Sequence, residues 1–129
     1  MDLENLSYKI RSAIFEVFKE LGPGLLESVY EIALLKELVL LGIQAKSQVV
    51  VPVFYKGEYL ESGFRIDILV ENKIIIEIKS IKELEDVHKK QLLTYLKLSE
   101  LQLGFLVNFN TNLIQDKVSL FRIVNNYQQ

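Results

Sequence analysis

Two short segments in which every second residue is apolar constrain this fold more than any other feature. One covers residues 64–70 and the other covers Ile74–Lys79. Alternation with a period of two is typical of β-strands that bury one face. The intervening residues 71–73 form a connection short enough for a β-hairpin. We therefore expect an antiparallel hairpin with one apolar row, formed by Phe64, Ile66, Ile68 and Val70 in its first strand and by Ile74, Ile76 and Ile78 in its second.

The register of this hairpin brings two acidic side chains face to face. If the apolar rows of both strands lie on one side, Val70 pairs with Ile74, and Asp67 lies beside Glu77 on the other side. Directly opposed side chains in an antiparallel pair have Cβ atoms about 4.5–5.5 Å apart, so like charges there are destabilising. The flanking isoleucines add a desolvation cost. Some other interaction must therefore offset the repulsion and the desolvation of these two carboxylates.

Three kinds of compensation are open at this point. A divalent cation could bind both carboxylates, and oxygen ligands of this kind suit magnesium or manganese. The two carboxyl groups could instead share a proton. The third alternative is a structural grid of ion pairs, because the same register sets Arg65 beside Lys79 on the face that carries Asp67 and Glu77.

The rest of the chain predicts helices and further strands around the hairpin. Helical spacing of apolar residues covers Leu3–Leu21, 25–41 and 82–98. Strand-like composition covers 47–55, 59–70, Ile74–Lys79, 104–108 and 118–124. Pro52 indicates that the 47–55 strand lies at a sheet edge or carries a bulge. The order α-α-β-β-β-α-β-β predicts a mixed α/β (α+β) fold, and 129 residues suit one domain over 1–129.

Composition excludes several functional classes. The chain has no cysteine and one histidine, which excludes a disulfide framework and a thiolate zinc site. The histidine, His88, is expected to be solvated and without a role. A net charge of −2 argues against nucleic-acid binding through bulk positive charge, although a bound divalent cation reverses the local sign. Without an apolar leader or a membrane-length apolar run, a cytoplasmic protein without membrane contact is expected.

Polar side chains outside the hairpin could complete a site. In the 82–98 helix, Gln91 takes a position on the apolar stripe and Tyr95 follows one turn later, so both are expected to face the sheet. The alternatives are a buried structural amide for Gln91 and core packing for Tyr95. In the 25–41 helix, Glu27 lies in the first turn, where the helix dipole alone favours an acidic residue. Its functional interpretation is a further metal ligand.

The sequence resembles a known family in its N-terminal half. Gly24, Glu27 and Tyr30 match the signature of the GxxExxY proteins, which belong to the PD-(D/E)XK nuclease-like superfamily. The resemblance extends over nearly the whole chain, from the first helix to Val124. It implies a restriction-endonuclease-like core with a central mixed sheet flanked by helices.

Two further motifs are similar to those of the superfamily. Asp67 followed by Glu77 and Lys79 resembles the D…(D/E)xK core. The segment from Gln91 to Tyr95 resembles the QxxxY motif of the RecB-like and lambda-exonuclease-like branches. Together with the GxxExxY signature, these motifs are more specific than the ExK triplet alone.

The resemblance implies a metal site. Asp67 and Glu77 would hold one or two magnesium ions, with manganese as a substitute, helped by Glu27 and the carbonyl of Ile78. Such an ion polarises the scissile phosphate and lowers the pKa of a bound water.

The resemblance also implies roles for three other side chains. Lys79 would orient the attacking water and stabilise charge on the phosphoryl oxygens, while Gln91 and Tyr95 would position water or phosphate. The implied activity is phosphodiester hydrolysis in DNA, or in RNA, that leaves a 5′-phosphate. Short Holliday-junction resolvases share the superfamily. A narrower form of the nuclease hypothesis is therefore a homodimer that acts on branched DNA. The rival is a non-catalytic nucleic-acid-binding or protein-interaction module that retains the fold.

Overall fold

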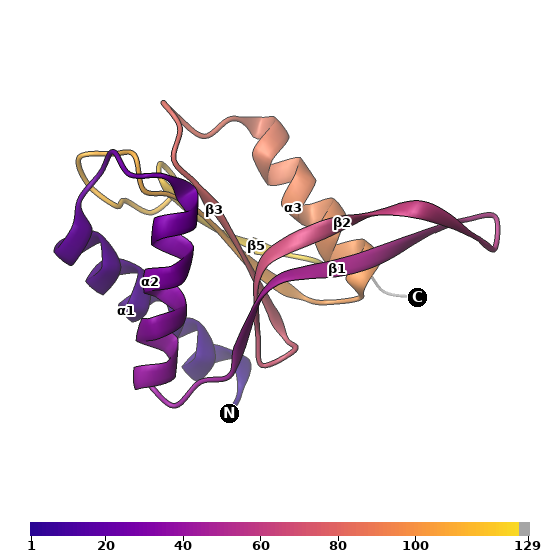
Figure 1. Ribbon diagram of the computed structural model, residues 1–129, viewed down its shortest axis with the longest axis horizontal. Coiled ribbons are helices and arrows are strands. Elements are labelled where there is room, and N and C mark those ends of the chain that lie inside the picture. The colour runs from indigo at the N-terminus through magenta and orange to yellow at the C-terminus, as the bar shows by residue number, and fades with distance from the viewer. Residues whose placement is uncertain (127–129) are drawn as a thin grey trace.

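The computed structural model describes residues 1–126 (Figure 1). Its helices are α1 (Leu3–Leu21), α2 (Glu27–Leu40) and α3 (Asp86–Ser99). Its strands are β1 (Ala45–Tyr55), β2 (Glu58–Val70), β3 (Ile74–Lys79), β4 (Leu103–Asn108) and β5 (Leu120–Val124). This is the order expected from the sequence. The mixed α/β class with a restriction-endonuclease-like arrangement is thus confirmed.

The five strands form one mixed sheet in the order β1-β2-β3-β4-β5. Only β3 and β4 are parallel, and the other neighbours are antiparallel. Helices α1 and α2 pack on one face and α3 packs on the other, so two apolar clusters lie on opposite sides of the sheet (Figure 1). Within residues 1–126, no helix is long and apolar enough to cross a membrane.

The bounds of α1 follow from its end residues. The Asp2 side chain accepts a hydrogen bond from the backbone N–H of Asn5 at 2.8 Å, which satisfies a free donor of the first turn. At the other end Gly22 adopts φ +67, a conformation that favours glycine, and its N–H donates to the carbonyl of Phe18. The chain is therefore released from the helix where the segment that leads to α2 begins.

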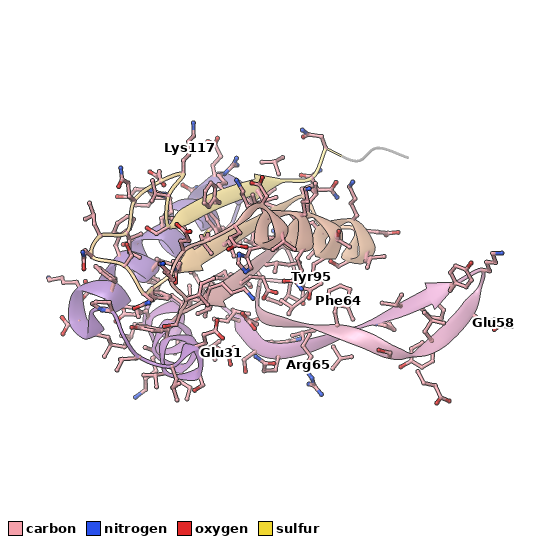
Figure 2. All side chains as sticks on the ribbon, turned by 90° about the horizontal axis from the view of Figure 1, so that it is seen from above. Glu31, Glu58, Phe64, Arg65, Tyr95 and Lys117 are labelled. Carbon is pink, nitrogen blue, oxygen red and sulfur yellow. The ribbon has the colours of Figure 1, made fainter. Side chains whose placement is uncertain are left out.

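Strand β1 meets both expectations raised by Pro52. It lies at the edge of the sheet, and its register with β2 shifts between Pro52 and Val53. Beyond this irregularity β1 and β2 continue as a two-stranded arm that extends away from the body (Figures 1 and 2). Gly63 lies opposite Pro52, where a Cβ atom would come 2.4 Å from the carbonyl oxygen of Val51. The close approach of β1 and β2 at this point therefore requires a glycine at position 63.

The apolar row of β2 does not stay on one face, contrary to the sequence expectation. Ile68 and Val70 pack beneath α1 and α2, whereas Ile66 and Phe64 belong to the cluster beneath α3. The change occurs at Asp67. The residue of β1 that lies opposite Asp67 is Gln48, whose φ angle is +52. A residue in the left-handed region breaks the pleat of its own strand, and β1 changes face at the same place: Ala45 packs against the cluster beneath α1 and α2, whereas Val49 packs against the cluster beneath α3.

Helix α3 begins four residues later than the sequence suggested. The backbone N–H of Glu85 donates to Nδ1 of His88 at 2.9 Å, and the Glu85 side chain in turn accepts from the His88 backbone. This reciprocal capping box fixes the first turn of the helix at Asp86. The expectation that His88 is solvated and without a role was wrong, because the half-buried imidazole caps the helix.

We expect Gly63→Ala to destabilise the protein by about 1–3 kcal/mol, because a methyl group there collides with backbone that cannot move aside easily. Urea denaturation of this variant and of Glu61→Ala, an exposed position in the same strand, measures the difference. Equal midpoints for Gly63→Ala and the parent would contradict the close approach.

Candidate active site

The backbone ladder between β2 and β3 ends where the two acidic side chains lie. The last paired residues are Ile68 and Ile76. One residue further, Oε2 of Glu77 accepts a hydrogen bond from the N–H of Asp67 at 2.9 Å. In return, Oδ2 of Asp67 accepts from the N–H of Ile78 at 2.8 Å. The structure thus brings Asp67 and Glu77 together as the register indicated, with each carboxylate bound to the backbone of the opposite strand.

The site places two carboxyl groups close together, one of them in a buried position. Glu77 is 7% exposed, and burial together with the neighbouring charge of Asp67 raises its pKa to about 8. The positive charge of Lys79 acts in the opposite direction, but more weakly. The pKa of the Tyr95 hydroxyl is also raised, first by burial and then by the charges of Glu77 and Asp67. Tyr95 therefore lies within the field of both carboxylates.

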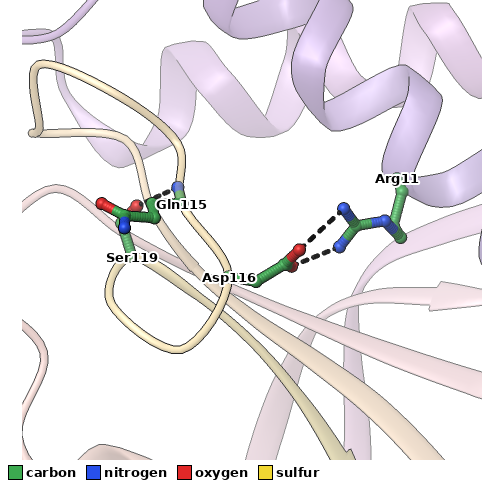
Figure 3. Close-up of polar contacts among 4 residues, drawn as sticks. All are labelled: Arg11, Gln115, Asp116 and Ser119. Carbon is green, nitrogen blue, oxygen red and sulfur yellow. Dashed lines mark hydrogen bonds and ion pairs between the residues drawn. The ribbon is translucent and has the colours of Figure 1, made fainter.

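The grid of ion pairs that the sequence left open is not formed. Within residues 1–126, the ion pairs closer than 4 Å join Arg11 to Asp116 (Figure 3) and Lys89 to Asp86, and neither involves the paired carboxylates. Arg65, expected beside Lys79, is exposed and pairs with β1, and its side chain points away from Tyr95 (Figure 2). The ladder between β2 and β3 ends before Arg65, which explains the separation.

Glu27 connects the start of α2 to the end of β3. Its Oε2 accepts a hydrogen bond from the N–H of Ser80 at 3.1 Å. The Ser80 hydroxyl donates to the carbonyl of Leu25 at 2.6 Å. Two contacts from one residue therefore hold the chain after Lys79 against the N-terminal turn of α2. Glu27 is exposed, which leaves its carboxylate accessible to solvent.

Tyr30 and Gly24 shape the segment that carries Glu27. The buried hydroxyl of Tyr30 donates to the carbonyl of Gly22 at 2.7 Å and accepts from the N–H of Leu25 at 3.1 Å. Its ring stacks on Phe109 with centroids 4.3 Å apart. Gly24 has φ +92, which a residue with a side chain rarely adopts. These two motif positions thus have a structural explanation.

A small open pocket of about 160 Å³ lies beside the carboxylate pair. Its lining comes from α2, β1, β2 and β3 and consists of Glu27, Ser28, Glu31, Gln48, Asp67 and Ile78. Three of the four metal ligands expected from the sequence line this pocket, and the fourth, Glu77, is bound to Asp67 at its side.

Sequence analysis missed Glu31 and Gln48. Nε2 of Gln48 donates to Oε1 of the half-buried Glu31 at 2.8 Å. Burial and the charge of Asp67 raise the pKa of Glu31. A signal for Glu31 was present, because it follows Glu27 by four residues and so shares its helix face. No sequence signal identifies Gln48, since its place in the pocket depends on an unusual backbone conformation.

Tyr95 and Gln91 differ in how well they match the expectation. Tyr95 is half-buried and its ring stacks on Phe64 at 4.1 Å with an interplanar angle of 9° (Figure 2). Gln91 is exposed, so the expectation that it lies on the buried stripe of α3 was wrong. The buried stripe of α3 passes through Leu92 and Leu96 instead. A shift of one residue turns a helix by about 100°, which moves Gln91 to the solvent-exposed side.

The donor chemistry at the pocket fits a hard divalent cation. Its candidate ligands are carboxylate oxygens and the main chain at Ile78, without sulfur or imidazole. In residues 1–126, no three acidic or histidine side chains converge closely enough to hold an ion by themselves. Magnesium commonly keeps several waters and takes one or two carboxylates from the protein, so a site of that kind does not require three converging side chains.

Comparison with known proteins identifies similar chains. A family described as the PD-(D/E)XK nuclease superfamily matches residues 4–121. The crystal structure of SSO0001 is 27% identical in sequence, with a TM-score of 0.58, and the match covers 79% of this chain and 52% of that one. The chain therefore spans about half the length of that protein. None of the curated proteins matches the chain.

We expect the metal-free protein to lose stability between about pH 5 and about pH 8 through Glu77. The pKa of Glu77 is raised from 4.5 to about 8 on folding, so in that range the folded state holds a proton that the unfolded chain has released. The free energy of unfolding then falls as pH rises. Glu77→Gln keeps an acceptor for the Asp67 N–H and should flatten this part of the profile. Urea denaturation in EDTA across the range tests this, with exposed Glu83→Gln as the control. Parallel profiles for Glu77→Gln and the parent would be incompatible with the assignment.

Proposed function

The chain belongs to the PD-(D/E)XK nuclease superfamily, and on that basis we propose that it is a magnesium-dependent nuclease of the GxxExxY group that cleaves phosphodiester bonds in DNA. The observation that carries the proposal is the buried carboxyl pair, in which Asp67 and Glu77 each accept a hydrogen bond from the other's strand and in which burial and the Asp67 charge raise the pKa of Glu77. PD-(D/E)XK nucleases generally use divalent metals and act on nucleic acids. A bound cation would offset the charge that the fold concentrates here.

The proposed ligands are Asp67 and Glu77, with Glu27 and the carbonyl of Ile78 as further donors. When bound, magnesium polarises the scissile phosphate and lowers the pKa of a water molecule. Each of the carboxylates of Asp67, Glu77 and Glu27 has one oxygen engaged by a backbone N–H. These contacts fix the orientation of the side chains before a ligand arrives, which reduces the reorganisation needed on binding.

Lys79 is proposed to stabilise the charge that develops on the phosphoryl oxygens and to orient the attacking water. It follows Glu77 by two residues on β3, and its positive charge reaches the carboxylate pair. The absence of an ion pair closer than 4 Å to Lys79 within residues 1–126 leaves the ammonium available to a substrate. The backbone carbonyl of Lys79 accepts from the N–H of Phe109 at 2.9 Å, which holds this part of β3 in place.

Tyr95 and Gln91 are proposed to bind water or phosphate beside the carboxylates. The stack on Phe64 limits the motion of the Tyr95 ring, and both carboxylates act on its hydroxyl. Gln91 lies one turn earlier on the same helix and is exposed, so its amide is free to reach a bound substrate.

The accessible pocket supports catalysis over the rival non-catalytic module. An interaction module that merely retains the fold would have Asp67 closed over by packing or separated from the strand that carries Glu77. Asp67 instead lines an open pocket and contacts the strand that carries Glu77. The net charge of −2 implies that substrate affinity depends on the local cation and Lys79 rather than on the overall charge of the protein.

We expect Lys79→Ala to reduce manganese-dependent cleavage of labelled DNA by about 10²–10³-fold, the typical loss when one electrostatic transition-state contact is removed. The variant should still show the rise in melting temperature that manganese gives the parent. Lys36→Ala, an exposed lysine on α2, serves as the control. A panel of single-stranded, duplex, flap and junction substrates covers the substrate forms. A Lys79→Ala protein as active as the parent would refute the role.

Gln91→Leu should fold normally, because the side chain is exposed, and should lower turnover roughly 10–100-fold, as loss of an outer positioning contact does. Steady-state cleavage rates and melting temperatures, compared with those of Lys97→Leu on the same helix, measure both effects. Unchanged turnover would leave Gln91 as a surface residue without a role in the reaction.

A further inference from the structure

Gln48 interrupts the ladder between β1 and β2 at one position only. The pairs Ser47–Ile68 and Val49–Ile66 flank it in an unchanged register, so Gln48 lies across from Asp67 without forming a ladder pair. Its φ of +52 falls in the left-handed region, which costs energy for any residue with a Cβ atom. Strain at a single residue between ladder pairs of unchanged register is maintained only where surrounding contacts hold it.

The side chain of Gln48 is hydrogen-bonded to a residue of α2. Its Nε2 donates to Oε1 of Glu31 at 2.8 Å, and both side chains line the pocket that contains Asp67. An amide donor orients a carboxylate without neutralising it, whereas a lysine in the same place would cancel its charge. Burial raises the pKa of Glu31, and the hydrogen bond from Gln48 acts against that shift, so this contact favours the ionised carboxylate beside Asp67.

We propose that Gln48 is a positioning residue of the metal site: its left-handed backbone turns the amide toward α2, where it holds Glu31 beside Asp67 so that this carboxylate takes part in cation binding. The inference rests on the proposed function and adds to it a residue pair outside the superfamily motifs. Glu31 is the residue that contributes charge, and Gln48 acts through it.

A purely structural role makes a different prediction. If the Gln48–Glu31 contact only fastens β1 to α2, its removal should lower stability and leave cation affinity unchanged. Under the proposal the strained backbone serves the site rather than the fold. Gln48→Gly relieves the strain, because glycine adopts positive φ readily, and it removes the amide. Its melting temperature in EDTA should be equal to or higher than that of the parent, while its affinity for manganese falls.

The experiment is a titration with Mn²⁺ followed by electron paramagnetic resonance, together with thermal melts in EDTA. We expect Gln48→Gly to raise the Kd for Mn²⁺ roughly 10–100-fold, the usual loss when a residue that orients a ligand is removed. The matched control is Lys117→Gly, which relieves a similar φ of +64 at an exposed position on the opposite side of the molecule from Glu31 (Figure 2). Its Kd should equal that of the parent.

A second variant keeps the test independent of the glycine substitution. Glu31→Gln should raise the Kd at least as much as Gln48→Gly, and the double variant should lose no more than Glu31→Gln alone, because the two residues act as a unit. Parent-like affinity in Gln48→Gly, or additive losses in the double variant, would overturn the inference while the proposed function stands. A parent protein that binds no Mn²⁺ would overturn both.

Discussion

The reciprocal hydrogen bonds between Asp67 and the strand that carries Glu77 are the interaction on which the rest of the site depends. Where the β2–β3 ladder stops, backbone donors would otherwise be left without partners in a partly buried place. The two carboxylates supply the missing acceptors. Because these side chains, and not the opposite backbone, accept the hydrogen bonds, the two strands can diverge beyond Ile68 and Ile76. Strand β2 then continues with β1 as an arm. In an ordinary sheet the acceptors would be neutral backbone carbonyls. Here the acceptors are carboxyl groups, which can carry a negative charge.

A second set of contacts places α2 at this point of divergence. Ser80 extends β3 toward the segment before α2, and Tyr30 holds that segment in the shape that its glycines allow. The signature positions of the N-terminal half therefore have two separate functions. Tyr30 and Gly24 are explained by local backbone geometry, while Glu27 faces the solvent at the pocket.

The success of sequence analysis depended on how regular each segment is. The β2–β3 register between Val70 and Ile68 was predictable because a pleat of period two admits one pairing that buries all the isoleucines. Pro52 predicted that β1 lies at an edge or carries a bulge, because it lacks an N–H, and the strand has both features. The change of face at Asp67 was not predictable, since it lies opposite a left-handed backbone at Gln48 that no sequence signal indicates. Gln91 was misplaced because neighbouring helix positions point in very different directions.

The contact between Ser80 and Glu27 joins residues 53 positions apart. The β2–β3 hairpin can form through local contacts, but closing so long a segment carries an entropic cost that only later packing offsets. The pocket also draws on β1, so it does not exist until α2, both hairpin strands and the edge strand have assembled. A partly folded chain with the hairpin alone would hold the carboxylate pair without its surroundings. A ligand that depended on the whole pocket would therefore bind the assembled fold in preference to a partly folded chain, and it would stabilise the assembled fold by that difference.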